Sequence, residues 1–150
     1  AVYRELLIVA KELDLPAVIH SRGAWRDAFD IAQEIGVKKA LFHWYDGSLE
    51  VLKDIMKVGY FVSTTPNLAY NANTRAAVDK VNIEQLLIET DSPVYFLNRK
   101  TGDGFKAEPK EVWRTARAYA EFKSMELSQV LTVFNTNAKR FFNLEGITVS

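Results

Sequence analysis

Four short apolar segments recur along the chain, and each is followed by a stretch with helical periodicity. The segments are Ala17–His20, Lys39–His43, Tyr60–Ser63 and Leu86–Glu89. Short continuous runs rich in β-branched and aromatic residues are typical of strands buried on both faces. Strands separated by a helix pair in parallel, because the helix returns the chain to the same end of the sheet. The sequence therefore predicts an α/β protein built from parallel βα units.

The segments between these strands carry helical signals. Ser48 is placed to cap a helix at its start, and Gly36 is placed to end one. Leu49 lies on the helix face that we expect to be buried. The predicted helices are 2–13, 24–35, 48–58, 73–81, 109–122, 127–134 and 136–142, and residues 97–106 are expected to form a mobile loop.

Two architectures are built from such units, an open doubly wound sheet and a (β/α)₈ barrel. A complete barrel has eight units and typically about 250 residues, whereas this chain has four units in 150 residues. No Gly-x-Gly-x-x-Gly fingerprint or Walker-type loop follows any predicted strand, which argues against a doubly wound nucleotide-binding domain. We therefore expect residues 1–150 to form a single partial domain, half of a barrel.

Composition limits the partners and the surroundings of the chain. Apolar residues make up 48%, enough for the core of one domain. The 19 basic and 19 acidic side chains cancel, so a polyanionic substrate would need local positive charge. The absence of cysteine excludes disulfides and a thiolate metal site, and it fits a cytoplasmic protein. No apolar run reaches the about 18 residues of a membrane span, so we expect no membrane association.

Three potential metal ligands stand at the carboxyl ends of predicted strands. His20 ends the first strand, His43 ends the second, and Asp91 lies just beyond the fourth. The carboxyl ends of barrel strands form one rim, where barrel enzymes hold their active sites. Imidazole and carboxylate groups together suit Zn²⁺, Mn²⁺ or a similar ion. From the residues alone two interpretations stay open, a metal site, or rim histidines with a turn-forming aspartate.

Several segments resemble signature segments of the TatD family of metal-dependent deoxyribonucleases. Leu15–Arg22 is similar to the family's Leu-Pro-x-x-Ile-His-Ser-Arg, and Phe42–Ser48 is similar to its His-Cys-Phe-Ser-Gly-Ser. Leu86–Pro93 matches Leu-Leu-x-Glu-Thr-Asp-Ser-Pro at every fixed position, and Asn137–Phe142 resembles Asn-Ala-x-Arg-Leu-Phe. These segments come in the family's order. The resemblance implies the C-terminal half of a TIM-type (β/α)₈ barrel.

The resemblance also implies a divalent-metal-dependent hydrolase that cleaves phosphodiester bonds by metal-activated water, with single-stranded DNA or 3′ ends as substrate. His20, His43 and Asp91 would bind one or two ions of Zn²⁺, Mn²⁺ or Mg²⁺. Asp91 would also be the catalytic residue that orients or deprotonates the water. Arg22 is a candidate for phosphate binding, and a rim ion pair is its alternative. We expect Glu89 to support the site from outside, with its side chain pointing away.

The chain departs from the family pattern after the second histidine, where Trp44-Tyr45-Asp46 stands in place of Cys-Phe-Ser. Trp44 and Tyr45 are candidates for stacking on a base of the substrate, and packing at the strand end is the alternative. Asp46 adds a negative charge that would repel a phosphate unless it is paired. Ala107–Pro109 replaces the family's Asn-Glu-Pro. The alternative substrate is therefore another ester or an amide.

Part of the family's metal site has no counterpart in this sequence. A His-x-His pair on the first strand is missing, because the chain has only two histidines, His20 and His43. The chain also starts at Ala1 within a helical pattern, and four open strands leave two unpaired edges. We therefore expect full activity to need an N-terminal half, and expect that half or a second copy of the chain as partner. An inactive half-barrel fragment is the remaining alternative.

Overall fold

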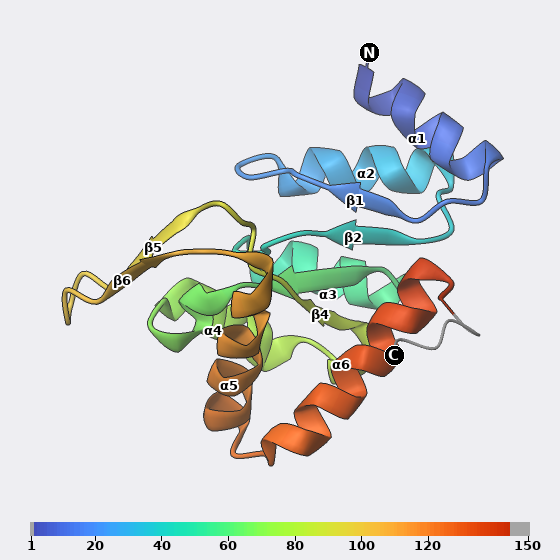
Figure 1. Ribbon diagram of the computed structural model, residues 1–150. Helices are drawn as coiled ribbons and strands as arrows, with labels where there is room; N and C mark the ends of the chain where they lie inside the picture. Colours follow the sequence, from blue (N-terminus) through green and yellow to red (C-terminus); the bar gives the residue numbers. More distant parts are fainter. Residues whose placement is uncertain (1, 145–150) are drawn as a thin grey trace.

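The strands form one four-stranded parallel sheet in the computed structural model, which describes residues 2–144 (Figure 1). They lie side by side in the order of the sequence, and every neighbouring pair is parallel. A doubly wound sheet reverses its strand order, whereas sequential order is that of a barrel. The predicted parallel βα units are therefore confirmed. The strands are β1 (Ala17–Ile19), β2 (Ala40–Phe42), β3 (Phe61–Thr64) and β4 (Leu86–Ile88).

The predicted helices between the strands are present. The Ser48 hydroxyl accepts a hydrogen bond from the peptide N–H of Val51 and so caps α3. Gly36 ends α2 with a φ of 75°, a left-handed conformation that favours glycine. The prediction that Leu49 is buried is wrong, because α3 begins at the surface and Leu49 is 47% exposed. The helices are α1 (Val2–Glu12), α2 (Trp25–Ile35), α3 (Leu49–Lys57) and α4 (Ala72–Lys80), with short 3₁₀ turns η1 (Pro66–Ala69) and η2 (Ile83–Gln85).

The last third of the chain contains η3 (Pro109–Glu111), α5 (Val112–Lys123) and α6 (Leu127–Phe142). The predicted break within α6 is wrong. The Thr136 hydroxyl donates to the carbonyl of Thr132, and the Asn137 amide donates to the carbonyls of Ile83 and Leu86. These polar groups find partners without interrupting the helix. Within residues 2–144, no helix is both long and apolar enough to cross a bilayer.

An antiparallel hairpin occupies the segment in which a loop is predicted. β5 (Tyr95–Leu97) pairs with β6 (Gly104–Lys106), so that prediction is wrong at both ends of its range. Asn98 organises the turn, because its side chain accepts from the N–H of Lys100 and its carbonyl accepts from the N–H of Gly102. No apolar run marks β6 in the sequence, because Phe105 stands between Gly104 and Lys106. In Figure 1 the hairpin projects to the left.

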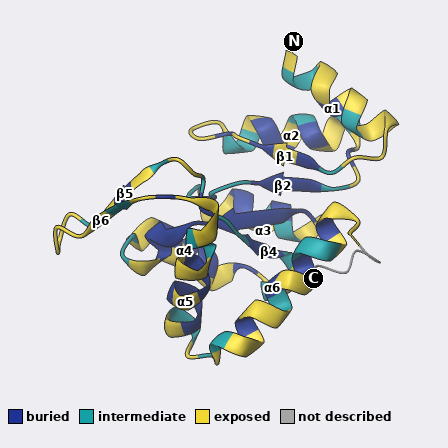
Figure 2. Ribbon diagram, viewed as in Figure 1, coloured by how far each residue is buried: buried dark blue, intermediate teal, exposed yellow. Residues whose placement is uncertain are grey.

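Apolar side chains pack on both faces of the sheet, because successive strand residues point to opposite sides. The helices cover the outer face, where Ile19 and Phe42 belong to the main core. On the inner face Leu41, Phe61 and Leu87 contact Phe141 of α6. Figure 2 shows β2 and β3 in dark blue between these layers. The middle of the sheet is therefore buried on both sides, as the continuous apolar runs predict.

β1 forms an open edge of the sheet. Among the described strands it pairs only with β2, and Val18 is 57% exposed. Leu6 and Val9 of α1, and Leu13 just after it, are exposed as well, and Figure 2 shows much of α1 in yellow. An unpaired strand beside exposed apolar side chains is a surface suited to contact with another segment.

Candidate metal centre

The ends of β2 and β4 bring a histidine and two carboxylates together. His43 follows β2 directly, and Glu89 and Asp91 follow β4. One potential ligand atom from each of these side chains lies within 4.8 Å of the others, and all three residues are half-buried. We call His43, Glu89 and Asp91 the rim cluster. It lies where the strands end, on the side from which the hairpin projects in Figure 1.

His20 lies next to the rim cluster and is not part of the group within 4.8 Å. Its Nδ1 atom is 2.7 Å from Nε2 of His43, and the two ring centroids are 4.9 Å apart. It follows the edge strand β1 and is exposed. The structure therefore places His20 against His43 and places His43 near Asp91. That these three residues bind a metal ion stays a prediction.

Glu89 makes the most hydrogen bonds within the cluster. Both carboxylate oxygens lie 3.3 Å from Nδ1 of His43, and one accepts the peptide N–H of Trp44 at 3.0 Å. The Ser63 hydroxyl donates to the same carboxylate. The prediction that Glu89 points away from the site is wrong. It lies two residues beyond Leu87 and therefore continues the inner face of β4.

The contact with Glu89 determines which nitrogen of His43 carries the proton and which one, facing Nδ1 of His20, is left as the acceptor. An ionised carboxylate only accepts hydrogen bonds, so Nδ1 of His43 carries the proton that it shares with Glu89. Nε2 then has the lone pair that a cation requires. A carboxylate behind an imidazole is the arrangement found for metal-binding histidines, where it fixes the tautomer and the ring orientation.

Two residues at the site have left-handed backbone conformations. Trp44 and Asp91 both have a φ of 46°. This conformation costs roughly 1–2 kcal/mol for a residue with a Cβ atom, and such residues concentrate at functional sites. In this conformation the N–H of Trp44 donates to Ser63 Oγ at 2.9 Å as well as to Glu89.

The candidate substrate-binding residues differ in position. The Arg22 guanidinium lies 4.7 Å from the centre of the Trp44 ring. Arg22 is exposed and Trp44 is half-buried, and the two side chains lie together beside the cluster. Tyr45 is only 1% exposed, packs on Trp25 and donates to the carbonyl of Ser48 at 2.7 Å. Burial raises the pKa of the Tyr45 hydroxyl. The prediction that Tyr45 stacks on a base is therefore wrong, and the packing alternative holds for it.

Sequence reasoning overlooked Ser63 and the position of Glu89. These residues end the third and fourth predicted strands, as His20 and His43 end the first and second. The same strand-end position that points to the histidines points to them too. Applying that rule to all four strands would have included both residues in the candidate site.

The donor set of the rim cluster fits a divalent cation. One imidazole nitrogen and two carboxylates suit Zn²⁺ and Mn²⁺, and carboxylate oxygens also suit Mg²⁺. The two negative charges would balance the charge of one ion. His20 offers a further nitrogen in contact with His43.

Sequential parallel βα units with histidine and carboxylates at the rim define the class of metal-dependent hydrolases built on a (β/α) barrel. The family model of TatD-related DNases matches residues 1–143. The chain therefore belongs to the TatD family of metal-dependent hydrolases.

Relatives of known sequence and structure agree with this assignment. An uncharacterized metal-dependent hydrolase of Methanocaldococcus jannaschii is 35% identical over 141 residues, which are 94% of this chain and 54% of that protein. The human deoxyribonuclease TATDN3 is 30% identical over 143 residues, 93% of this chain and 51% of that protein. The crystal structure of a TatD homologue from Escherichia coli superposes with a TM-score of 0.81 at 24% identity, covering 91% of this chain and 53% of that one. The chain thus spans about half the length of these relatives and matches half of a TatD barrel.

Proposed function

We propose that this chain contributes to the hydrolysis of phosphodiester bonds in DNA, with a divalent metal ion bound at the rim cluster. The observation that carries the proposal is the convergence of ligand atoms from His43, Glu89 and Asp91 within 4.8 Å, in a chain of the TatD family. The name of the human relative, a deoxyribonuclease, supports the choice of substrate.

The proposal gives each residue a separate task. A bound divalent ion supplies positive charge beside the phosphodiester and a lower pKa for a nearby water molecule. His43 and Asp91, with the adjacent His20, would hold that ion. The Glu89 carboxylate would face the same ion and also keeps the His43 ring in place through Nδ1. The Asp91 carboxylate accepts the proton of the attacking water. Arg22 binds a phosphate oxygen by a charge-assisted hydrogen bond.

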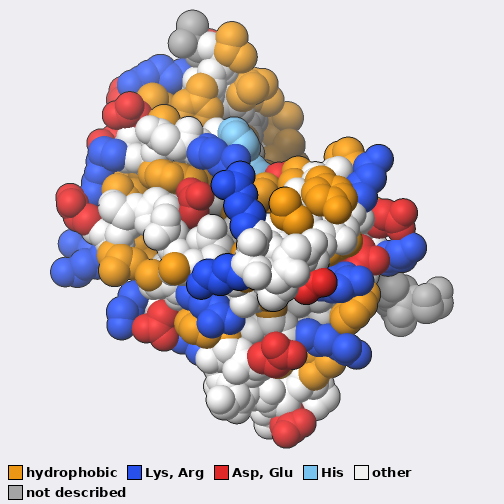
Figure 3. Space-filling view, turned by 90° about the vertical axis from the view of Figure 1, so that its left-hand side faces the viewer, with side chains coloured by type: hydrophobic (Ala, Val, Ile, Leu, Met, Phe, Trp, Pro, Cys, Tyr) orange, Lys and Arg blue, Asp and Glu red, His pale blue; other side chains and the backbone are white. Residues whose placement is uncertain are grey.

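Attraction of a polyanion must come from the rim itself, because the whole chain has no net charge. Figure 3 looks onto the rim side and shows basic side chains running down from beside an exposed histidine. Acidic side chains are scattered on the same face, so the positive charge is local. A substrate would meet positive charge next to the site and not over the whole surface.

A metal titration tests the site. We expect Zn²⁺ or Mn²⁺ to bind the chain and raise its melting temperature, and EDTA to reverse the change. His43→Ala and Asp91→Asn each remove a proposed ligand. Each should lower the affinity for the metal ion by about 10-fold to 100-fold. Asp30→Asn on α2 is the matched control, because it removes one exposed negative charge away from the rim. If all three variants bound the metal ion with the affinity of the unchanged chain, the proposed metal site would be refuted.

A cleavage assay tests the substrate. Short single-stranded DNA labelled at its 5′ end should be shortened from the 3′ end in the presence of Mn²⁺, and His43→Ala should abolish the products. Metal binding without any cleavage of DNA, with turnover of another phosphoester, carboxylic ester or amide, would favour the alternative hydrolase. Intact DNA and intact esters despite tight metal binding would favour an inactive half-barrel.

We also propose that the open edge at β1 is covered in the active protein. The relatives are about twice as long as the matched region, and Val18 of β1 and Leu6 and Val9 of α1 are exposed. The segment that completes the barrel in the relatives, or a second copy of this chain, would cover this edge. A monodisperse monomer in light scattering at micromolar concentration would count against the second copy.

A further inference from the structure

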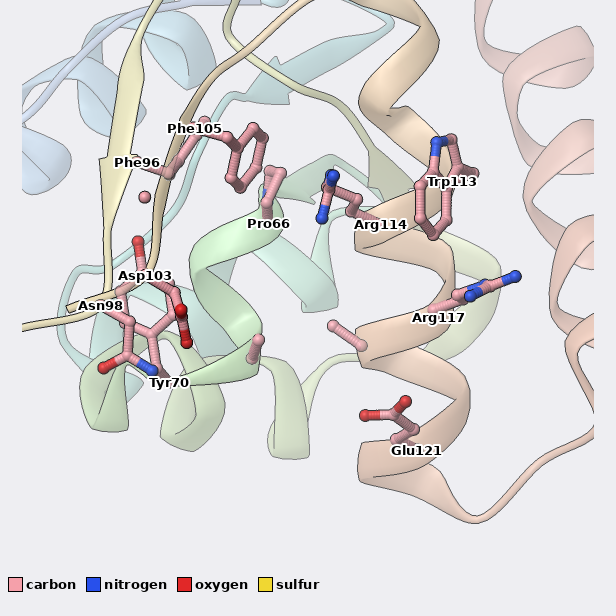
Figure 4. Close-up of a pocket in the computed structure, with 13 residues that line it drawn as sticks. Pro66, Tyr70, Phe96, Asn98, Asp103, Phe105, Trp113, Arg114, Arg117 and Glu121 are labelled. Atoms are coloured by element: carbon pink, nitrogen blue, oxygen red, sulfur yellow. The ribbon is translucent and has the colours of Figure 1, made fainter. Parts of the chain in front are cut away.

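A pocket of about 550 Å³ lies beside the rim, between η1, the β5–β6 hairpin and α5 (Figure 4). Arg114 reaches from α5 toward Phe105 and Pro66, while Tyr70, Asn98 and Asp103 gather at the opposite end. Its size lies within the range of small-molecule sites, about 300–1,000 Å³. None of the residues proposed for the metal centre lines it.

A continuous series of ring contacts connects the pocket to the candidate metal centre. Trp44, the residue after His43, has its ring centroid 5.5 Å from that of Phe96. Phe96 stacks on Phe105 with centroids 5.6 Å apart and an interplanar angle of 27°. The Arg114 guanidinium then lies 4.5 Å from the Phe105 centroid. Phe96 is buried within this series, so the contacts connect the pocket to the rim cluster through the protein, and a strand of nucleic acid would pass over the surface above them.

The α5 wall of the pocket combines an aromatic ring with positive charge. Trp113 is 40% exposed, and the guanidinium groups of Arg114 and Arg117 lie 4.9 and 4.5 Å from its ring centroid. Arg114 is paired with Glu111, whereas no ion pair holds Arg117 within the described part of the chain. An accessible ring beside a free guanidinium can stack on a base and bind its phosphate.

The opposite wall is polar but not basic. Asn98 has both donors and acceptors and Asp103 adds acceptors on this wall, while Glu121 adds a second carboxylate from α5. Two carboxylates make the pocket unsuited to a run of several phosphates. They suit the edge of a nucleobase, which presents amino and imino donors. The lining therefore fits one unstacked nucleotide better than an extended polyanion or an apolar ligand.

We infer that this pocket is a nucleotide subsite that holds one unstacked base of a single-stranded DNA whose scissile bond lies at the rim cluster. Trp113 stacks on the base and Arg117 binds its phosphate. Asn98 and Asp103 lie at the opposite end of the pocket and are left to the edge of a neighbouring nucleotide. The inference rests on the proposed function, because it takes the rim cluster as the place of cleavage. It adds a reason for a preference for single strands, since a base inside a duplex cannot enter the pocket.

Direct binding tests the subsite without relying on catalysis. A fluorescein-labelled oligothymidylate is titrated with the full chain in EDTA, and affinity is read from fluorescence anisotropy at several salt concentrations. Trp113→Leu should weaken binding about tenfold through the loss of one stacked base. Arg117→Gln should lower the slope of log affinity against log salt by about one counterion. Lys53→Gln on the exposed side of α3 is the charge-matched control and should change neither value.

The outcomes separate the subsite from the proposed function. Loss of affinity in Trp113→Leu and Arg117→Gln, with unchanged melting temperatures, supports the subsite even if no metal-dependent cleavage is found. Metal-dependent cleavage with wild-type affinity in both variants supports the proposed function and overturns the subsite. Equal affinity for the same sequence as a duplex would also overturn it, because stacking on Trp113 requires an unpaired base.

Discussion

Replacing Phe141 by alanine should destabilise the chain far more than the same change at Phe142. The two rings are neighbours in α6, but Phe141 is fully buried and Phe142 is 40% exposed. Phe141 packs on Leu41, Phe61 and Leu87 from three strands of the inner face. These strand residues stand two positions before His43, Ser63 and Glu89. The ring therefore supports the strands that carry the rim cluster.

The expected cost follows from the packing of the ring. Deleting a fully buried phenyl group removes its transfer free energy and leaves a cavity, together about 3–5 kcal/mol. The Phe141 ring also makes a tilted contact with Phe61, with 5.1 Å between the ring centroids. Losing this aromatic contact places the expected cost in the upper part of that range. Phe142→Ala should cost about 1 kcal/mol or less, as for a partly exposed side chain. Phe141→Leu keeps most of the volume and should cost less than about 1.5 kcal/mol.

Urea unfolding followed by tryptophan fluorescence measures these differences. The urea midpoint should be highest for Phe142→Ala, lower for Phe141→Leu and lowest for Phe141→Ala. The dependence of the unfolding free energy on urea concentration should be similar in all three variants. Equal losses for the two alanine variants would refute the reasoning, because they would show that the inner face is not packed under Phe141. A loss above about 3 kcal/mol for Phe141→Leu would also refute it, since the site would then not tolerate a leucine.

Three further changes probe other parts of the fold. Asn137→Ala leaves the carbonyls of Ile83 and Leu86 without their donor and should lower the free energy of unfolding by about 2–4 kcal/mol. Urea unfolding measures this loss, and Asn135→Ala at an exposed position of the same helix serves as the control. Ser48→Ala removes the cap of α3 and should cost about 1 kcal/mol, which thermal unfolding would show as a lower midpoint. Burial raises the pKa of Tyr3 to about 12, above the about 10 of an unfolded chain, so its stabilising contribution is complete below pH 10 and is lost as pH rises toward 12. Tyr3→Phe should reduce that alkaline loss, and urea midpoints measured at several pH values would check it.

The strands and their order could be predicted because their signals are local. Each strand is a short apolar run such as Leu86–Ile88, and each helix between them has one apolar face. The hairpin and the length of α6 could not be predicted in this way. Asn137 stays helical because its side chain reaches the carbonyls of Ile83 and Leu86, more than fifty residues earlier in the chain. A pattern within one segment does not contain that contact.

The directions of the site side chains could be predicted up to the end of each strand, but not for the residues that follow it. His43 still follows the alternation of β2, so its direction can be derived from the sequence. Trp44 then adopts a left-handed conformation, and the next side chain, Tyr45, turns into the core. No spacing rule predicts where a side chain points after such a residue. The positions of Tyr45 and Asp91 therefore depend on backbone geometry that only the structure supplies.

The two histidines are held with different strength, and this difference connects the candidate metal centre to the open edge. His43 is 13% exposed in its side chain, and its ring is fixed by Glu89. His20 is exposed, follows the edge strand, and touches the site through His43. Since nothing among residues 2–144 pairs with the free side of β1, the orientation of His20 depends on whatever covers that edge. We therefore expect metal affinity and completion of the barrel to be coupled through His20, whereas the contacts that hold the His43 ring are already formed in this chain.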